Sequence, residues 1–269
     1  MSEDGLSPHY FIVWQRGYQP SRSEHEGAVR RAHRAVRYLA ALDQDHAQIA
    51  NKERGTYLVR EGDEVDACIV LLSGFIYRSK FAASGARQIL SIHVRGDLVD
   101  LQNSILKIAD HNVQTLTRVE VAYISRSAML EVAVTHPGIA LALWRDTLID
   151  GSVFREWILN VGHRSARQRI CHLLCEIVVR QEAAGLTKGP EYQWPMTQDE
   201  IGDATGLTNV HVNRTIKRLK ADGLFTTNMR SVTILDWLQL QDAGDFTSAY
   251  LHQPVPRARH DPVKATETN

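Results

Sequence analysis

The stretch MTQDEIGDATGLTNVHVNRTIKRLKADGLF, residues 196–225, constrains the fold more than any other part of the chain. Thr197 and Glu200 have the spacing of a capping box, in which each side chain accepts a hydrogen bond from the other residue's amide. Gly206 is suited to a sharp turn, and Thr208 is suited to cap a second helix. The pattern therefore predicts two short helices joined by a tight turn, which is a helix-turn-helix.

The second helix of this stretch has two different faces. Val212, Ile216 and Leu219 recur at helical spacing and predict the buried face, and Gly223 is placed to end the helix. The opposite face is rich in donors, and Asn and Arg side chains can pair with adenine and guanine edges in the major groove. A basic face that is simply exposed to solvent is the alternative. We expect DNA contacts from Thr197, Thr208, Asn209, Val210, His211, Asn213, Arg214, Lys217 and Arg218.

Composition and charge exclude several classes of protein. The 269 residues include 31 Lys and Arg and 31 Asp and Glu, so binding to nucleic acid requires a local concentration of cations. No window approaches the roughly 18 uninterrupted apolar residues of a membrane span, and the acidic start lacks the pattern of a secretory signal. Cys68, Cys171 and Cys175 are too few for a disulfide framework and suit a reducing compartment. We therefore expect a cytoplasmic protein without a membrane partner.

The pattern of apolar residues changes along the N-terminal half of the chain. Residues 26–50 have apolar side chains at helical intervals, which predicts one or two short helices that include Ile49. Residues 55–127 contain short β-branched runs separated by glycine turns, which predicts a small antiparallel β-roll or jelly roll. We expect a flexible arm over 1–25 and a β-roll domain with N-terminal helices over 26–135.

A long helical pattern follows from Pro137, a residue suited to the first position of a helix. A helix over 137–164 would be about 42 Å long, which is more than a small barrel can cover. We therefore expect residues 136–163 to form a dimerisation helix that pairs with its copy, and the alternative is a helix packed on its own domain. The predicted interface is the apolar stripe of Trp144, Leu148, Phe154, Ile158 and Val161.

The remaining residues fit a winged helix over 164–250. A helix over 164–182 precedes the helix-turn-helix, a hairpin pattern over 225–234 has its turn near Asn228, and a short helix is expected over 236–247. Residues 251–269 are polar and lack an apolar period, so we expect a disordered tail. The predicted fold class is α+β, with an antiparallel β-roll, a long dimerisation helix and a C-terminal winged helix-turn-helix.

Several stretches together resemble the Crp/Fnr family of bacterial transcription regulators. The sharpest is EIGDATGLTNVHVNRTIKRL from Glu200, and REGD from Arg60, LLSG from Leu71 and RSARQRI from Arg164 add to it. The resemblance implies a sensory β-roll and a homodimer whose two recognition helices lie about one DNA turn apart on a palindromic operator. The partners it implies are double-stranded DNA and a second copy of the chain, and RNA polymerase is a further candidate.

Cyclic-nucleotide-binding members of this family carry a phosphate cassette with a Gly-Glu pair and a later Arg. Those positions correspond here to Asp100 and Leu101, and to Ala109 and Asp110. The only Lys or Arg in this segment is Lys107, and uncompensated carboxylates would repel a buried phosphate. The cassette is therefore degenerate, and we expect no cyclic nucleotide to bind.

No cofactor, metal site or catalytic residue is predicted. An iron–sulfur cluster needs grouped cysteines, whereas Cys68 stands alone, and Cys171 with Cys175 is more typical of a helix core than of a metal site. Haem or another effector stays open, and His93 fits a satisfied or exposed strand residue. A cupin-like metal oxygenase is an alternative function, but it needs a second histidine beside His93. A third alternative is an interaction module that does not bind DNA, and we expect no enzyme.

Overall fold

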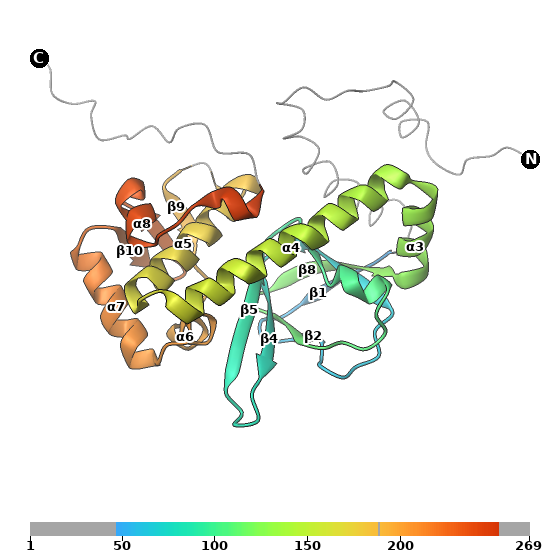
Figure 1. Cartoon of the computed structure of the whole chain (residues 1–269), viewed down its shortest axis with the longest axis horizontal. Helices are drawn as coiled ribbons and strands as arrows, with labels where there is room; N and C mark the ends of the chain where they lie inside the picture. The colour runs from blue at the N-terminus through green and yellow to red at the C-terminus, as the bar shows by residue number, and fades with distance from the viewer. Residues whose placement is uncertain (1–46, 188, 253–269) are drawn as a thin grey trace, which may run out of the picture.

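The computed structural model describes residues 47–187 and 189–252 (Figure 1). The expected arm over 1–25, the helices predicted before residue 47 and the tail from residue 253 lie outside the described residues. Within them the predicted α+β class is confirmed: strands form the N-terminal half, one long helix crosses the molecule, and a helical half with a small sheet follows (Figure 1).

Two four-stranded antiparallel sheets form the N-terminal roll, with strand orders β1-β8-β3-β6 and β2-β7-β4-β5. The sheets bury a continuous apolar core that includes Ile69, Leu71 and Val121. The strands are β1 Ala47–Lys52, β2 Tyr57–Val59, β3 Ala67–Ser73, β4 Ile76–Phe81, β5 Arg87–His93, β6 Leu98–Val99, β7 Asn112–Thr115 and β8 Val119–Ser125.

One part of the predicted N-terminal helices is wrong. Residues 47–50 belong to β1, which pairs with β8 in antiparallel register, so that Ile49 lies opposite Ala122. Strand pairing supplies hydrogen-bond partners that an isolated period of apolar residues cannot reveal, and long-range pairing overrides a weak helical pattern.

The long helix predicted from Pro137 is α4, Pro137–His163, and it follows a shorter helix, α3, Arg126–Thr135, that the sequence pattern did not predict. Ser125 caps α3 by accepting a hydrogen bond from Ala128 N. Among the described residues no single helix is long and apolar enough to cross a membrane. Only α3 and α4 taken together pass that test, and they are bent by 119° at the break.

The C-terminal half is a winged helix. The elements are α5 Ala166–Ala183, β9 Glu191–Gln193, α6 Gln198–Thr205, α7 Asn209–Ala221, β10 Phe225–Asn228, β11 Ser231–Ile234, α8 Trp237–Ala243 and the short 3-10 helix η2 Ser248–Leu251. The hairpin is confirmed, and β9 adds a third strand beside β11. The last α-helix ends earlier than predicted, and Leu251 is buried in the core, so the boundary of the predicted tail at residue 251 is wrong.

A single apolar cluster joins the two halves. It contains roll residues such as Phe75, Tyr77 and Ile89 together with Ile177 of α5 and Ile201 of α6. Figure 1 shows α6 beside the β4–β5 hairpin, below α4. The helix-turn-helix is therefore packed directly against the roll.

Candidate nucleic-acid interface

The helix-turn-helix has the local geometry that its sequence predicts. The Glu200 amide donates to Thr197 Oγ1 at 3.2 Å, and the Thr197 amide donates to Glu200 Oε2 at 2.7 Å. Gly206 ends α6 in the left-handed region, with φ of 66°, and the Thr208 hydroxyl accepts from the His211 amide to cap α7. These contacts satisfy amides that a helix start leaves without partners.

One face of α7 is buried. Val212 and Leu219 are fully covered, as predicted, and Gly223 follows the helix with φ of 74°. Ile216 is only half-buried, and the neighbouring Thr215 is buried.

The opposite face of α7 is exposed and rich in donors and cations. Val210 is 78% exposed near the start of the helix. Arg214 is exposed one turn later, where a guanidinium can pair with guanine O6 and N7. Six further polar or charged side chains belong to this exposed face or its start, namely Thr208, Asn209, His211, Lys217, Arg218 and Lys220.

Two side chains predicted to contact DNA are hydrogen-bonded to α6. Asn209 Nδ2 donates to Asp199 Oδ1 at 2.6 Å, and Asn213 Nδ2 donates to Gln198 Oε1 at 3.1 Å. Asn213 is accordingly half-buried. An Asn that pairs with adenine uses its amide nitrogen and oxygen together, so either side chain must leave α6 before it can do so. In this conformation both asparagines fix α7 on α6.

The β10–β11 hairpin, which is the wing, carries an exposed arginine that was not among the predicted DNA contacts. Met229, at the turn of the β10–β11 hairpin, is fully exposed with φ of 45°, and the next residue, Arg230, is exposed as well. Lys220 of α7 hydrogen-bonds to Thr227 of β10, which ties the wing to the recognition helix. The sequence feature that could have indicated a DNA contact from the wing is Arg230, a basic residue in the hairpin turn after α7.

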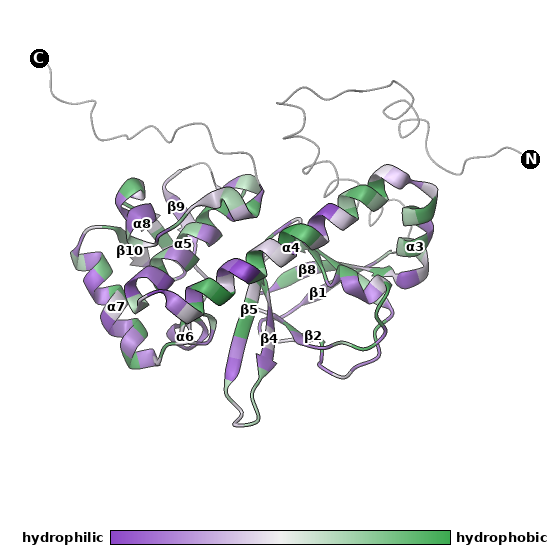
Figure 2. Ribbon diagram, viewed as in Figure 1, coloured by the Kyte–Doolittle hydropathy of each residue, from purple (hydrophilic) through white to green (hydrophobic). Residues whose placement is uncertain are grey.

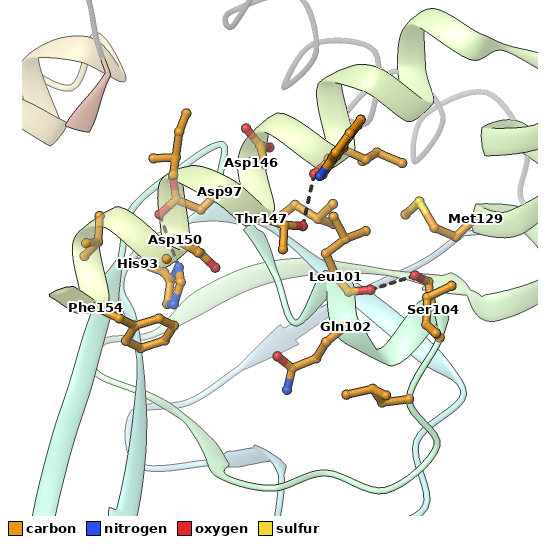
Figure 3. A pocket seen from close by; sticks show the side chains of 18 of the residues that line it. His93, Asp97, Leu101, Gln102, Ser104, Met129, Asp146, Thr147, Asp150 and Phe154 are labelled. Atoms are coloured by element: carbon orange, nitrogen blue, oxygen red, sulfur yellow. Dashed lines mark hydrogen bonds and ion pairs between the residues drawn. The ribbon is translucent and has the colours of Figure 1, made fainter. Parts of the chain in front are cut away.

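A cavity of about 670 Å³ lies between the roll and the helices α3 and α4 (Figure 3). Its wall is mostly apolar and includes Leu98, Met129 and Leu143. Figure 3 shows His93, Asp97 and Asp150 at one end, and the end of the cavity near Met129 lies beyond Leu101. The cavity is therefore an apolar chamber with a charged end.

Arg78 and Asp150 at the charged end belong to a network of ion pairs that continues behind the cavity wall to Asp100, His111 and Asp110. Arg78 Nε lies 2.8 Å from Asp100 Oδ1, and Arg78 Nη1 lies 2.9 Å from Asp150 Oδ2 on α4. His111 Nε2 lies 2.9 Å from Asp100 Oδ1, and its Nδ1 lies 2.6 Å from Asp110 Oδ1. Burial alone would raise the pKa of Asp100, but the hydrogen bond from His111 and the charge of Arg78 lower that pKa to about 2.

This network corrects the sequence interpretation of the cassette. Asp100 was expected to face an anion without compensation, whereas it is fully buried and neutralised by Arg78 and His111. Ala109 is buried as well, and Leu101 begins the short 3-10 helix η1, Leu101–Ser104. The arginine beside Asp100 is therefore supplied by β4 and not by the cassette segment.

His93 is satisfied rather than exposed. It is buried, with Nε2 3.0 Å from Ser91 Oγ and Nδ1 3.4 Å from Asp97 Oδ2. Burial, followed by the charge of Arg78, lowers the pKa of His93, so the ring is neutral near pH 7. Arg180 of α5 also reaches Asp97, with its Nη2 2.5 Å from Oδ2.

The predicted apolar stripe lies on α4, where hydrophobic and hydrophilic residues alternate along the ribbon (Figure 2), and most of its side chains are exposed. Trp144, Leu148 and Ile158 are 64%, 58% and 69% exposed. Phe154 and Val161 are half-buried, and Phe154 lines the cavity. The first three side chains therefore form an apolar face that the described chain leaves uncovered.

The three cysteines are buried and unbonded to one another. Burial raises the pKa of Cys68 and of Cys171 to about 12, so neither thiol ionises readily. Within residues 47–187 and 189–252 no group of three or more His, Cys, Asp or Glu side chains could hold a metal ion.

Two families match separate parts of the chain. The family described as a cyclic nucleotide-binding domain matches residues 50–136, and the family described as a Crp-like helix-turn-helix domain matches residues 168–243. The first range covers the roll and α3, and the second covers α5 to α8.

Curated relatives match along most of their length. The transcriptional activator protein FnrL of Cereibacter sphaeroides is 28% identical over 198 residues, which is 72% of this chain and 79% of FnrL. The transcriptional activator protein Anr of Pseudomonas protegens is 26% identical over 202 residues, which is 75% of this chain and 82% of Anr. Both are transcription regulators and not enzymes, so the oxygenase alternative has no support.

Solved structures share the fold. FixK2 from Bradyrhizobium japonicum is 21% identical with a TM-score of 0.68, and the match covers 73% of this chain and 96% of FixK2. A variant of CooA from Carboxydothermus hydrogenoformans is 15% identical with a TM-score of 0.61, and the match covers 77% of this chain and 94% of CooA.

Proposed function

The chain belongs to the Crp/Fnr family of transcription regulators and carries its DNA-binding helix-turn-helix, and from this premise we propose that it acts as a homodimer on a palindromic operator. The observation that carries the proposal is the exposed, donor-rich face of α7 on a fully capped helix-turn-helix. Arg214 pairs with a guanine edge, and the later cations Lys217 and Arg218 neutralise phosphates.

The apolar face of α4 supports the homodimer. Trp144, Leu148 and Ile158 are separated by four and ten residues, so they lie on one side of a long helix. An exposed apolar stripe of this kind is stabilised when a second copy covers it. Two-fold symmetry then presents two recognition helices to two half-sites.

The cavity supports an uncharged, apolar effector rather than a cyclic nucleotide. The cations in its wall already face carboxylates, since Arg78 pairs with Asp100 and Asp150 and Arg180 pairs with Asp97. A phosphate would have to displace one of these buried pairs, which is costly. The rest of the wall is mostly apolar and suits a molecule without charge.

The protein acts in the cytoplasm on double-stranded DNA. It regulates transcription through contact with RNA polymerase. This setting agrees with the three buried thiols, which carry no disulfide in the structure.

The test is a selection of binding sites from a random-sequence duplex pool with the purified protein. The proposal expects an enriched palindrome whose half-sites have centres about 10 base pairs apart. A pool without an enriched sequence, or with one unrepeated half-site, contradicts it.

A further inference from the structure

Two arginines of the roll reach across to the first helix of the helix-turn-helix. Arg54, between β1 and β2, has its Nη2 at 2.7 and 2.8 Å from the two carboxylate oxygens of Glu200. Arg87, at the start of β5, has its Nε at 2.8 Å and its Nη2 at 2.7 Å from Asp203 Oδ2. Glu200 and Asp203 are three residues apart, so both face the same side of α6.

Each arginine also donates hydrogen bonds to groups other than its carboxylate partner. Arg54 donates to the carbonyl oxygen of Leu116 in the roll, and at 3.2 Å to that of Pro195 just before α6. Arg87 donates to the hydroxyl of Tyr77 on β4 at 2.8 Å. A guanidinium that is held in this way fixes a carboxylate in direction as well as in distance.

The same contact continues into an apolar core. Tyr77 and Ile89 of the hairpin belong to one buried cluster with Ile201 and Ala204 of α6. Arg54 and Arg87 therefore flank an apolar contact between the roll and α6. The two ion pairs fix the orientation of α6 on the roll.

The position of α6 determines the position of the recognition helix. Glu200 closes the capping box with Thr197 while it is bound by Arg54. The first turn of α6 also holds α7, through Gln198 and Asp199. A displacement of α6 on the roll would therefore carry α7 with it.

We propose that Arg54 and Arg87 are positioning residues for DNA binding, which fix the helix-turn-helix on the roll in the orientation that a palindromic operator requires. The proposal rests on the proposed function, because it needs two half-sites bound at once. The ion pairs lie on α6 and leave the outer face of α7 uncovered, since Val210 and Arg214 stay exposed. The ion pairs therefore fix α6 and leave the DNA-binding face of α7 accessible.

The test compares two duplexes that contain the same two half-sites. One carries the palindrome selected by the wild-type protein, and the other carries two additional central base pairs, which rotate one half-site by about 70°. The measured quantity is the ratio of the two dissociation constants. A rigidly placed pair of recognition helices should prefer the selected spacing on the order of 100-fold, because the altered spacing prevents simultaneous binding.

The informative variants remove one ion pair at a time. Arg87→Ala breaks the pair with Asp203, and Glu200→Gln removes the charge that faces Arg54 but keeps a residue that can close the capping box. Each should reduce the spacing preference about tenfold, because a loosely held helix-turn-helix adapts to either duplex. Binding to a single half-site should change little, which a general loss of structure would not allow.

Charge reversal and a matched control complete the design. Arg87→Asp together with Asp203→Arg should recover the spacing preference that either single reversal loses. Arg118→Ala removes a roll arginine whose partner is Glu53 of the roll itself, and it should leave the preference unchanged.

Two results would overturn the proposal in distinguishable ways. If the wild-type protein prefers the selected spacing and both Arg87→Ala and Glu200→Gln keep that preference, the two arginines do not position the helix-turn-helix. If the wild-type protein itself shows no spacing preference, the homodimer on a palindrome is wrong, and the positioning role falls with it.

Discussion

Gly202 of α6 lies so close to Leu207 that a Cβ atom at position 202 would be 2.6 Å from the Leu207 carbonyl oxygen. The same two residues are joined by a hydrogen bond of 3.1 Å from the Leu207 amide to the Gly202 carbonyl. The turn of the helix-turn-helix therefore folds back onto α6 at a point where only glycine fits.

We predict that Gly202→Ala destabilises the protein. In an ordinary helix this change stabilises by about 1 kcal/mol, but here the obstructing atom belongs to the backbone and cannot rotate away. The free energy of unfolding should fall by about 1–3 kcal/mol, measured by denaturant titration. Gly162→Ala is the matched control, because position 162 lies near the end of α4 with nothing within 4 Å of a Cβ, so stability should stay equal or rise.

The helix-turn-helix could be predicted from the sequence because its signals are local. The Thr197 and Glu200 cap, the turn at Gly206 and the cap at Thr208 each join residues within a few positions. Once the ends of α6 and α7 are known, helical periodicity determines which residues of α7 face the core and which face solvent. Val212 and Leu219 of the predicted stripe are buried and Arg214 is exposed, as expected, whereas Ile216 is only half-buried.

Contacts between distant parts of the chain could not be predicted in this way. Strand β1 exists because it pairs with β8, and Arg78 neutralises Asp100 only because the roll brings β4 beside η1. Arg54 and Glu200 are 146 positions apart, and no sequence pattern around either residue identifies the other as its partner. Ion pairs across the fold depend on topology, and a single sequence does not show it.

We predict that Leu148→Glu combined with Ile158→Glu yields monomers. Both side chains are exposed on α4, so the change removes apolar contact with a second copy and places carboxylates opposite one another without disturbing the core. Sedimentation should show the loss of the dimer, and binding to a palindrome should fall to that of one half-site. Val134→Glu on α3 is the control for added charge, since Val134 is also exposed but lies outside the stripe. A dimer that persists in the double variant would contradict the interface.

The cavity can be tested with two dyes that differ only in charge. N-phenyl-1-naphthylamine is uncharged, and 1-anilinonaphthalene-8-sulfonate adds a sulfonate to the same ring system. We predict that the uncharged dye gains fluorescence with a dissociation constant in the micromolar range, about tenfold below that of the sulfonate. Ala140→Trp, which places a large side chain in the cavity, should abolish the signal.

Calorimetry with cyclic AMP and cyclic GMP should give no heat of binding, and micromolar binding of either would refute the expected ligand class.

His111 should make stability depend on pH. Burial lowers the pKa of this ring, but the hydrogen bond to Asp100 and the charge of Asp100 outweigh burial, so the folded pKa is raised. A raised pKa contributes stability that is fully present below the unfolded value of about 6.5 and is lost as the pH rises through the folded value. Asp100, with its pKa near 2, stays ionised over that range.

We therefore predict that His111→Asn lowers the free energy of unfolding more at about pH 5.5 than at about pH 8.5, with a loss of about 1–3 kcal/mol at the acidic value. Denaturant titrations at the two pH values measure the difference. His211→Asn, at an exposed position of α7 outside this network, is the control for replacing a histidine by asparagine. An equal loss for His111→Asn at both values would rule out an ionised His111.

We predict that α7 uses different side chains for base recognition and for phosphate binding. Arg214 is exposed one turn beyond Val210, and Lys217 is exposed about a further turn along. We expect α7 to rise out of the major groove at Lys217. Arg214→Ala should cost about 1–3 kcal/mol on the selected operator and flatten the preference at one base pair of each half-site. Lys217→Ala should weaken binding to selected and random DNA alike and reduce the salt slope by about one per subunit. Titrations over a range of salt concentrations measure both effects, and the reverse assignment would mean that α7 enters the groove about half a turn away from the face described.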